Sequence, residues 1–167
     1  MCLRCDGYSE EDVLRNIELT IATHGWYVQG VVNGPDERGP EWCFSIGLAE
    51  NYGLPELAVI GPEYSVGVRL VNAAAECLLD GYTLDDMAAV LGGRHGVVHQ
   101  SHVDSGDWFG TWSNYYGHLP EPGLFVQVFA PSGMFCACHR HLIPDLTVSP
   151  DTRAARRRAE SERRRRP

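Results

Sequence analysis

Lysine is absent from the 167-residue chain, whose positively charged side chains are fourteen arginines. This bias is typical of codon usage in a GC-rich bacterium. The sequence also lacks an apolar run close to the roughly 20 residues that span a bilayer. Its first seven residues do not follow the basic-then-apolar order of a signal peptide. We therefore expect a cytoplasmic protein that has no membrane partner.

Established catalytic signatures are missing as well. The chain contains no Gly-x-Ser-x-Gly elbow, no phosphate-binding loop, no dinucleotide fingerprint and no His-Glu-x-x-His motif. These absences leave open whether the protein is an enzyme. Function must then be sought in clusters of reactive side chains.

Charge is divided unevenly along the chain. Residues 1–150 hold six arginines and nineteen acids, a formal charge of −13, whereas residues 151–167 hold eight arginines and three acids, a formal charge of +5. Phosphate contacts need clustered cations, so the acidic part disfavours a broad nucleic-acid-binding face. We expect residues 149–167 to form a helical or disordered Arg-rich tail. It is either simply solvated or contacts nucleic acid or an acidic partner.

Hydrophobic periodicity and turn residues predict one α+β domain over residues 1–148. Ser9 and the acids after it are typical of a helix start, and Gly25 of a helix end. Further helices are expected at 65–80 and 83–91. Strands are expected at 26–32, 42–48, 56–61, 96–103, 108–116, 124–130 and 134–139. The predicted architecture is a mainly antiparallel β-sheet packed with two to three helices and followed by the tail.

Two cysteine-containing segments form the strongest chemical pattern. Cys2 and Cys5 have the spacing at which two thiolates of a tight turn bind one zinc ion. Residues 136–141 add two thiols and two imidazoles, and domain termini often lie close together. The candidate metal ligands are Cys2, Cys5, Cys136, Cys138, His139 and His141. Four such ligands would make the zinc structural. The alternatives are a redox pair of Cys2 with Cys5, or ordinary reduced thiols.

A second cluster follows a glycine pair in the middle of the chain. Strand alternation places His102 and Asp104 on one face, and His99 lies nearby on the other. With Trp108 they are candidates for a pocket that binds a small molecule or a flavin, in which Asp104 orients an imidazole or adds a metal ligand. The simpler interpretation is a half-exposed strand. Core packing is likewise the simpler role for the other aromatic side chains and for Cys43 and Cys77.

Several separated stretches resemble an uncharacterised bacterial family that is common in actinobacteria, domain of unknown function 4262. The stretches that carry the resemblance lie at 1–8, 24–26, 42–48, 50–57 and 127–128; among them are Cys2-Leu-Arg-Cys5, His24-Gly25-Trp26 and Glu50-Asn-Tyr-Gly-Leu-Pro-Glu56. The resemblance covers about residues 1–135 and implies no particular chemistry. At 135–141 the chain departs from the aromatic, proline-containing segment that is usual in such relatives.

These patterns predict a small accessory or binding domain with a Cys/His zinc site. One alternative is an enzyme whose aromatic and histidine pocket acts on a small molecule or uses flavin. The other is an interaction protein that contacts nucleic acid or an acidic partner through its tail.

Overall fold

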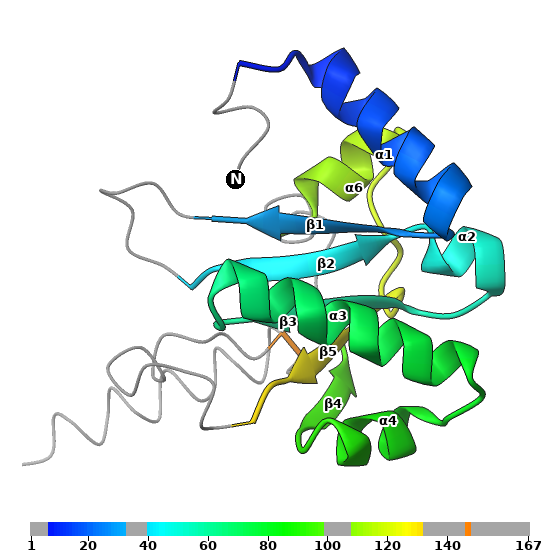
Figure 1. Ribbon diagram of the computed structural model, residues 1–167, viewed down its shortest axis with the longest axis vertical. Helices are drawn as coiled ribbons and strands as arrows, with labels where there is room; N and C mark the ends of the chain where they lie inside the picture. Colours follow the sequence, from blue (N-terminus) through cyan, green and yellow to red (C-terminus); the bar gives the residue numbers. More distant parts are fainter. Residues whose placement is uncertain (1–6, 33–39, 99–107, 132–145, 148–167) are drawn as a thin grey trace, which may run out of the picture.

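The computed structural model describes residues 7–32, 40–98, 108–131 and 146–147 (Figure 1). Its centre is a five-stranded sheet with the order β1-β2-β3-β5-β4. The strands are β1 Tyr27–Val31, β2 Trp42–Ile46, β3 Glu56–Ile60, β4 Arg94–Val97 and β5 Phe125–Phe129. The β3–β5 pair is parallel, and the pairs β1–β2, β2–β3 and β4–β5 are antiparallel. The predicted α+β class and mainly antiparallel sheet are therefore confirmed.

Two helices begin at capping boxes formed by local side chains. In α1, Glu10–His24, the Ser9 hydroxyl accepts from the Asp12 backbone N–H, and the Asp12 carboxylate accepts from the Ser9 N–H. Thr83 and Asp86 repeat this arrangement at the start of α4, Leu84–Val90. Each box satisfies backbone N–H groups that a helix start leaves without an intrahelical partner. The helix starts expected at Ser9 and Thr83 are confirmed.

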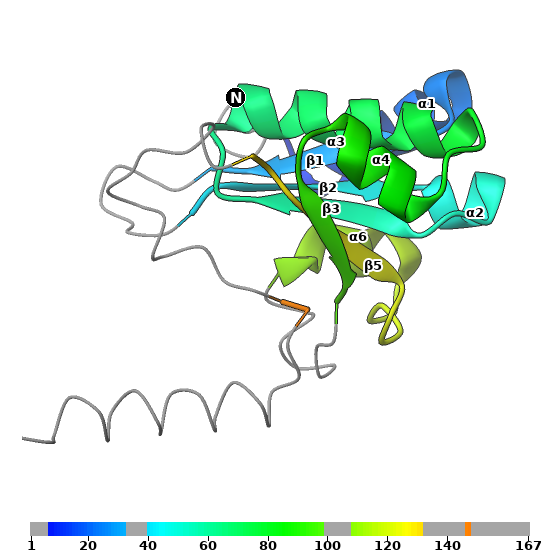
Figure 2. The ribbon, with the colours of Figure 1, turned by 90° about the horizontal axis from the view of Figure 1, so that it is seen from below.

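Helices cover both faces of the sheet. The long helix α3, Tyr64–Leu79, and α4 lie on one face, and α6, Gly110–Tyr116, lies on the other (Figure 2). Alternate residues of β3 serve the two faces, because Leu57 and Val59 pack with the α3 side whereas Ala58 and Ile60 pack with the α6 side. The sheet therefore separates two hydrophobic clusters within one domain. No helix of the described ranges is long and apolar enough to cross a membrane.

Helix α1 lies along the edge of the sheet that β1 forms (Figure 1). Its buried residues Ile17 and Ile21 pack with Phe44 and Ile46 in the cluster on the α6 side. The helix ends at Gly25, whose φ of 91° is left-handed, and the chain then turns directly into β1. This short turn holds the C-terminal end of α1 beside the first residues of β1.

The strand predicted at 108–116 is wrong, because most of this segment forms helix α6. Trp112 is buried there against Phe125, and Phe109 stacks on Phe125 with ring centroids 3.8 Å apart. Aromatic side chains favour strands when only local preference is considered, but packing against β5 selects the helix. A further short helix, α2 Leu48–Tyr52, lies in the β2–β3 connection, where the sequence predicts no helix.

The remaining predicted helices and strands overlap those of the structure where it describes them, although β2 ends at Ile46, two residues before the predicted end. β4 begins at Arg94 and overlaps the strand expected at 96–103, of which residues 99–103 lie outside the described residues. The strand expected at 134–139 and the Arg-rich tail from 149 also lie outside them.

Candidate functional site

A cleft of about 460 Å³ lies at the outer edge of β1, between α1 and α3. This volume falls within the range of small-molecule pockets, roughly 300–1,000 Å³. The lining residues come from the two helices, from the α1–β1 turn and from β1. They are Thr20, His24, Trp26, Tyr27, Val28, Val68, Asn72 and Glu76.

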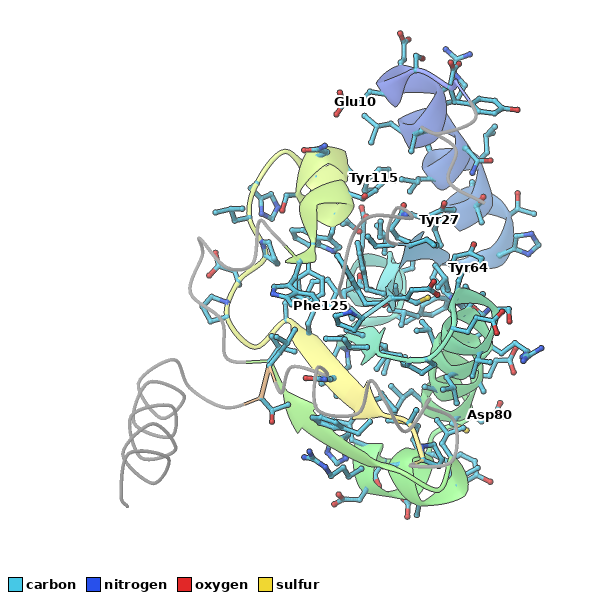
Figure 3. All side chains as sticks on the ribbon, turned by 90° about the vertical axis from the view of Figure 1, so that its left-hand side faces the viewer. Glu10, Tyr27, Tyr64, Asp80, Tyr115 and Phe125 are labelled. Carbon is cyan, nitrogen blue, oxygen red and sulfur yellow. The ribbon has the colours of Figure 1, made fainter. Side chains whose placement is uncertain are left out.

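Each helix contributes residues at four-residue spacing. Thr20 and His24 belong to α1, and Val68, Asn72 and Glu76 belong to α3. Residues four apart lie on the same face of a helix, so the cleft is bounded by one stripe of each helix. Figure 3 shows Tyr27 beside the C-terminal end of α1. It also shows α3 extending from Tyr64 toward Asp80.

Trp26 is fixed in the cleft by two contacts. Its indole N–H donates to the Asn72 side-chain oxygen at 2.9 Å. Its ring meets the Tyr52 ring edge-on, with centroids 6.4 Å apart. An indole nitrogen only donates, so this bond also sets the orientation of the Asn72 amide. The aromatic wall of the cleft is therefore held by α3 on one side and by α2 on the other.

The turn before Trp26 is held by α2 as well. The Asn51 side-chain amide donates to the Gly25 carbonyl at 2.7 Å. A Cβ at position 25 would lie 1.9 Å from the Tyr52 hydroxyl oxygen, so Tyr52 leaves space only for glycine. The left-handed backbone at Gly25 also disfavours any other residue. Residues of the 24–26 and 50–57 stretches thus meet beside the cleft.

The buried carboxylate of Glu56 holds α2 in place. Its oxygens accept from the Ser45 hydroxyl, from the Gly47 N–H at 2.9 Å and from the Ala49 N–H at 3.3 Å. The Ser45 oxygen in turn accepts from the Leu57 N–H at 2.8 Å. Glu56 therefore satisfies backbone donors at the start of α2 and fixes this helix to β2 and β3.

Burial raises the pKa of the Glu56 carboxyl above its ordinary value, although the hydrogen bonds from Ser45, Gly47 and Ala49 oppose the rise. Burial likewise raises the pKa of the neighbouring Tyr116 hydroxyl, with the negative charges of Glu56 and Glu50 as further causes. The Tyr116 hydroxyl donates to the Glu50 carboxylate at 3.2 Å. Tyr116 therefore stays protonated and joins α6 to α2.

The pocket predicted around His99 lies mainly outside the described residues, which include neither His99 nor His102 nor Asp104. Trp108 is described, and it has a packing contact. Its backbone carbonyl accepts from the Trp42 indole N–H at 2.9 Å, and the centroids of the Trp42 and Trp108 rings lie 4.8 Å apart.

The proposed metal ligands all lie outside the described residues as well, so the zinc site stays a prediction. They are Cys2, Cys5, Cys136, Cys138, His139 and His141. Within the described ranges, no group of three or more His, Cys, Asp or Glu side chains suits a metal ion. Cys43 is buried and Cys77 partly buried against the α3-side cluster, as expected for packing cysteines.

Sequence reasoning missed the cleft, although two signals for it were present. One is the polar residues at four-residue spacing, Thr20 and His24 in α1 and Asn72 and Glu76 in α3. The other is His24-Gly25-Trp26, one of the stretches that carry the family resemblance. Neither signal shows that the two helices approach each other at β1.

A family model described as a domain of unknown function, DUF4262, matches residues 20–136. The matched range contains every residue that lines the cleft. Of the proposed metal ligands, only Cys136 falls within it. No curated protein and no solved structure matches the chain.

Proposed function

This chain belongs to the DUF4262 family, whose description assigns no chemistry, and we propose from its geometry that it is a small-molecule-binding domain. The ligand occupies the cleft between α1, β1 and α3. The observation that carries the proposal is a cleft of about 460 Å³ that combines two aromatic rings with hydrogen-bonding side chains. Concave sites that mix an apolar wall with a few placed polar groups are the usual form of ligand pockets.

The cleft is organised before any ligand binds. Asn72 and Tyr52 hold the Trp26 ring, and Asn51 holds the turn that precedes it. A ligand therefore does not have to order these side chains, which reduces the entropy lost on binding. The buried Glu56 carboxylate supports this arrangement from beneath α2 and stands outside the residues that line the cleft.

A cleft-filling variant tests the proposal. Small molecules from a chemically diverse library are screened by ligand-observed NMR against the full chain and against Val68→Phe, which adds a ring inside the cleft. The matched control is Val90→Phe, because Val90 is an exposed residue of α4. We expect ligands that bind the wild type and Val90→Phe but lose binding to Val68→Phe.

Thr20→Phe fills the cleft from α1 and replaces Val68→Phe if the latter does not fold. Circular dichroism of each variant establishes that the fold is retained. Ligands that bind the cleft-filled and control variants equally, or a library without any ligand for the wild type, would contradict the proposal.

A further inference from the structure

Besides the Tyr27 phenol, which is neutral at pH 7, the ionisable side chains in the lining of the cleft are His24 and Glu76. Glu76 is exposed on α3, and no arginine is among the described residues that line the cleft. By the formal count at pH 7, in which histidine is not charged, the lining carries one negative charge. An anionic ligand would therefore meet a carboxylate without a cationic partner in the lining, whereas a cation would be attracted by it.

Existing hydrogen bonds leave acceptor lone pairs on Thr20 and Asn72, in the same lining as the Glu76 carboxylate. The Trp26 indole hydrogen is engaged by Asn72, and the Thr20 hydroxyl donates to the Asn16 carbonyl at 2.8 Å. Thr20 can then offer only oxygen lone pairs to a ligand. The Asn72 oxygen has a second lone pair, although the amide nitrogen of Asn72 donates, and the Glu76 carboxylate only accepts when ionised. These acceptors suit a ligand with several N–H donors.

The aromatic side chains add attraction for positive charge. Trp26 and Tyr27 both line the cleft. A cation within about 6 Å of such a ring is stabilised by the negative face of the ring. The formal charge of −13 on residues 1–150 acts in the same direction, because it raises the local concentration of cations around the domain.

We infer that the ligand of the cleft is an organic ammonium ion, a protonated amine carried on an aromatic or short aliphatic group. This inference rests on the proposed function and adds the ligand class. The ammonium group donates to Glu76, Thr20 and Asn72, and the apolar group lies against Trp26, Tyr27 and Val28.

Three indole derivatives that differ mainly in the charge of the side-chain terminus test this inference. Tryptamine is the cation, tryptophol is neutral and indole-3-propionate is the anion. Each is titrated into the ¹⁵N-labelled full chain, and the dissociation constant is taken from the shift of the Trp26 indole resonance. We expect tryptamine to bind most tightly and indole-3-propionate least tightly.

Two charge-removing variants locate the selectivity. Glu76→Gln should weaken tryptamine by about two- to five-fold, the range expected for a solvent-exposed ion pair, and leave tryptophol unchanged. Glu121→Gln removes one exposed carboxylate from the α6–β5 connection and should change neither. An equal effect of both variants would attribute the selectivity to the overall charge of the domain and would overturn the inference.

Other outcomes separate the two proposals. If indole-3-propionate binds as tightly as tryptamine, the ligand class is wrong while the cleft remains a binding site. The same holds if none of the three compounds binds but the library screen yields ligands that Val68→Phe excludes. If that screen yields none, both proposals fail.

Discussion

The Glu56 side chain combines full burial with an ionisable group. Its carboxylate accepts hydrogen bonds from Ser45, Gly47 and Ala49, so each of its oxygens has a partner. Removing these acceptors would leave buried donors unsatisfied, at about 1–3 kcal/mol for each. We conclude that Glu56 is a structural residue that holds α2, and through it the wall of the cleft.

The raised pKa of Glu56 predicts a characteristic pH dependence for Glu56→Gln. Above the ordinary pKa of 4.5, the unfolded chain releases the proton before the folded protein does, so the contribution of Glu56 to stability falls as pH rises through the folded pKa. Glutamine has no proton to lose. We expect the variant to be about 1 kcal/mol less stable than the wild type near pH 4.5, and this deficit to shrink as pH rises.

Urea unfolding of the wild type and of Glu56→Gln, from pH 4.5 upward, measures the difference in their free energies of unfolding. Glu121→Gln is the control, because it removes an exposed carboxylate outside α2. A deficit for Glu56→Gln that stays constant, or that grows as pH rises, would show that burial does not dominate the titration of Glu56.

The cysteines differ in chemical character. Burial raises the pKa of the Cys43 thiol to about 12, so it stays protonated and unsuited to metal binding.

We propose that zinc is held instead by Cys2 and Cys5 with ligands from 136–141. The full chain, purified without a tag or chelator, should contain about one equivalent of zinc, and Cys2→Ser/Cys5→Ser should lose it while Cys77→Ser retains it.

Elemental analysis and an absorption spectrum of the same sample check this proposal. Less than about a tenth of an equivalent of metal would reject the zinc site, because structural zinc binds tightly enough to survive purification. A yellow flavin spectrum would instead favour the predicted alternative in which an aromatic pocket with His99, His102, Asp104 and Trp108 holds a flavin.

At the scale of elements, α3 approaches β2 closely because residue 67 is glycine. A Cβ on Gly67 would lie 2.8 Å from the Cys43 sulfur. We expect Gly67→Ala to lower the free energy of unfolding by about 1–3 kcal/mol through overpacking. In a Cys43→Ala background the space opens, and the same change should raise stability by up to about 1 kcal/mol, since alanine is the better helix former.

A double-mutant cycle, measured by denaturant unfolding, isolates this contact. The double variant should then be clearly more stable than the sum of the two single effects on the free energy of unfolding predicts. Additive effects of the two substitutions would mean that α3 shifts away from β2 without cost.

Local chemistry predicts the elements that carry their own signals. The boxes at Ser9 and Thr83, and the left-handed Gly25, determine where α1 and α4 begin and where α1 ends. Helix α6 lies where the sequence predicts a strand, because its aromatic side chains favour strands locally. Its helical form follows from the packing of Trp112 against Phe125, a contact between two segments that the local pattern of either one does not reveal.

The cleft depends on contacts between residues that lie still farther apart in the sequence. Residues 20–28 and 68–76 form it, and they meet only because β1 lies at the edge of the sheet. Helix α2 was unpredicted for a similar reason, since the carboxylate that satisfies its first N–H groups comes from β3. The sequence therefore predicts the class of fold better than the site.

At the scale of the whole molecule, charge separates the tail from the rest of the chain. Residues 151–167 have a formal charge of +5 and residues 1–150 a formal charge of −13. Any affinity of the full chain for nucleic acid should therefore come from the tail and fall steeply as salt is added. Deletion of residues 151–167 should abolish it, as measured by fluorescence anisotropy with a labelled oligonucleotide.

Binding that survives this deletion would rule the tail out as its cause. It would also mean that the acidic part of the chain has a local cationic surface that its overall charge conceals.

The proposed binding of small molecules between α1, β1 and α3 can be tested directly with the four tryptophans of the chain. Trp26 lines the cleft, whereas Trp42, Trp108 and Trp112 belong to the cluster on the α6 side or pack against it. In ¹H–¹⁵N spectra of the labelled full chain, a bound ligand should shift the Trp26 indole resonance and leave the other three unchanged. Ligands that shift those three resonances and leave the Trp26 resonance unchanged would contradict binding in the cleft.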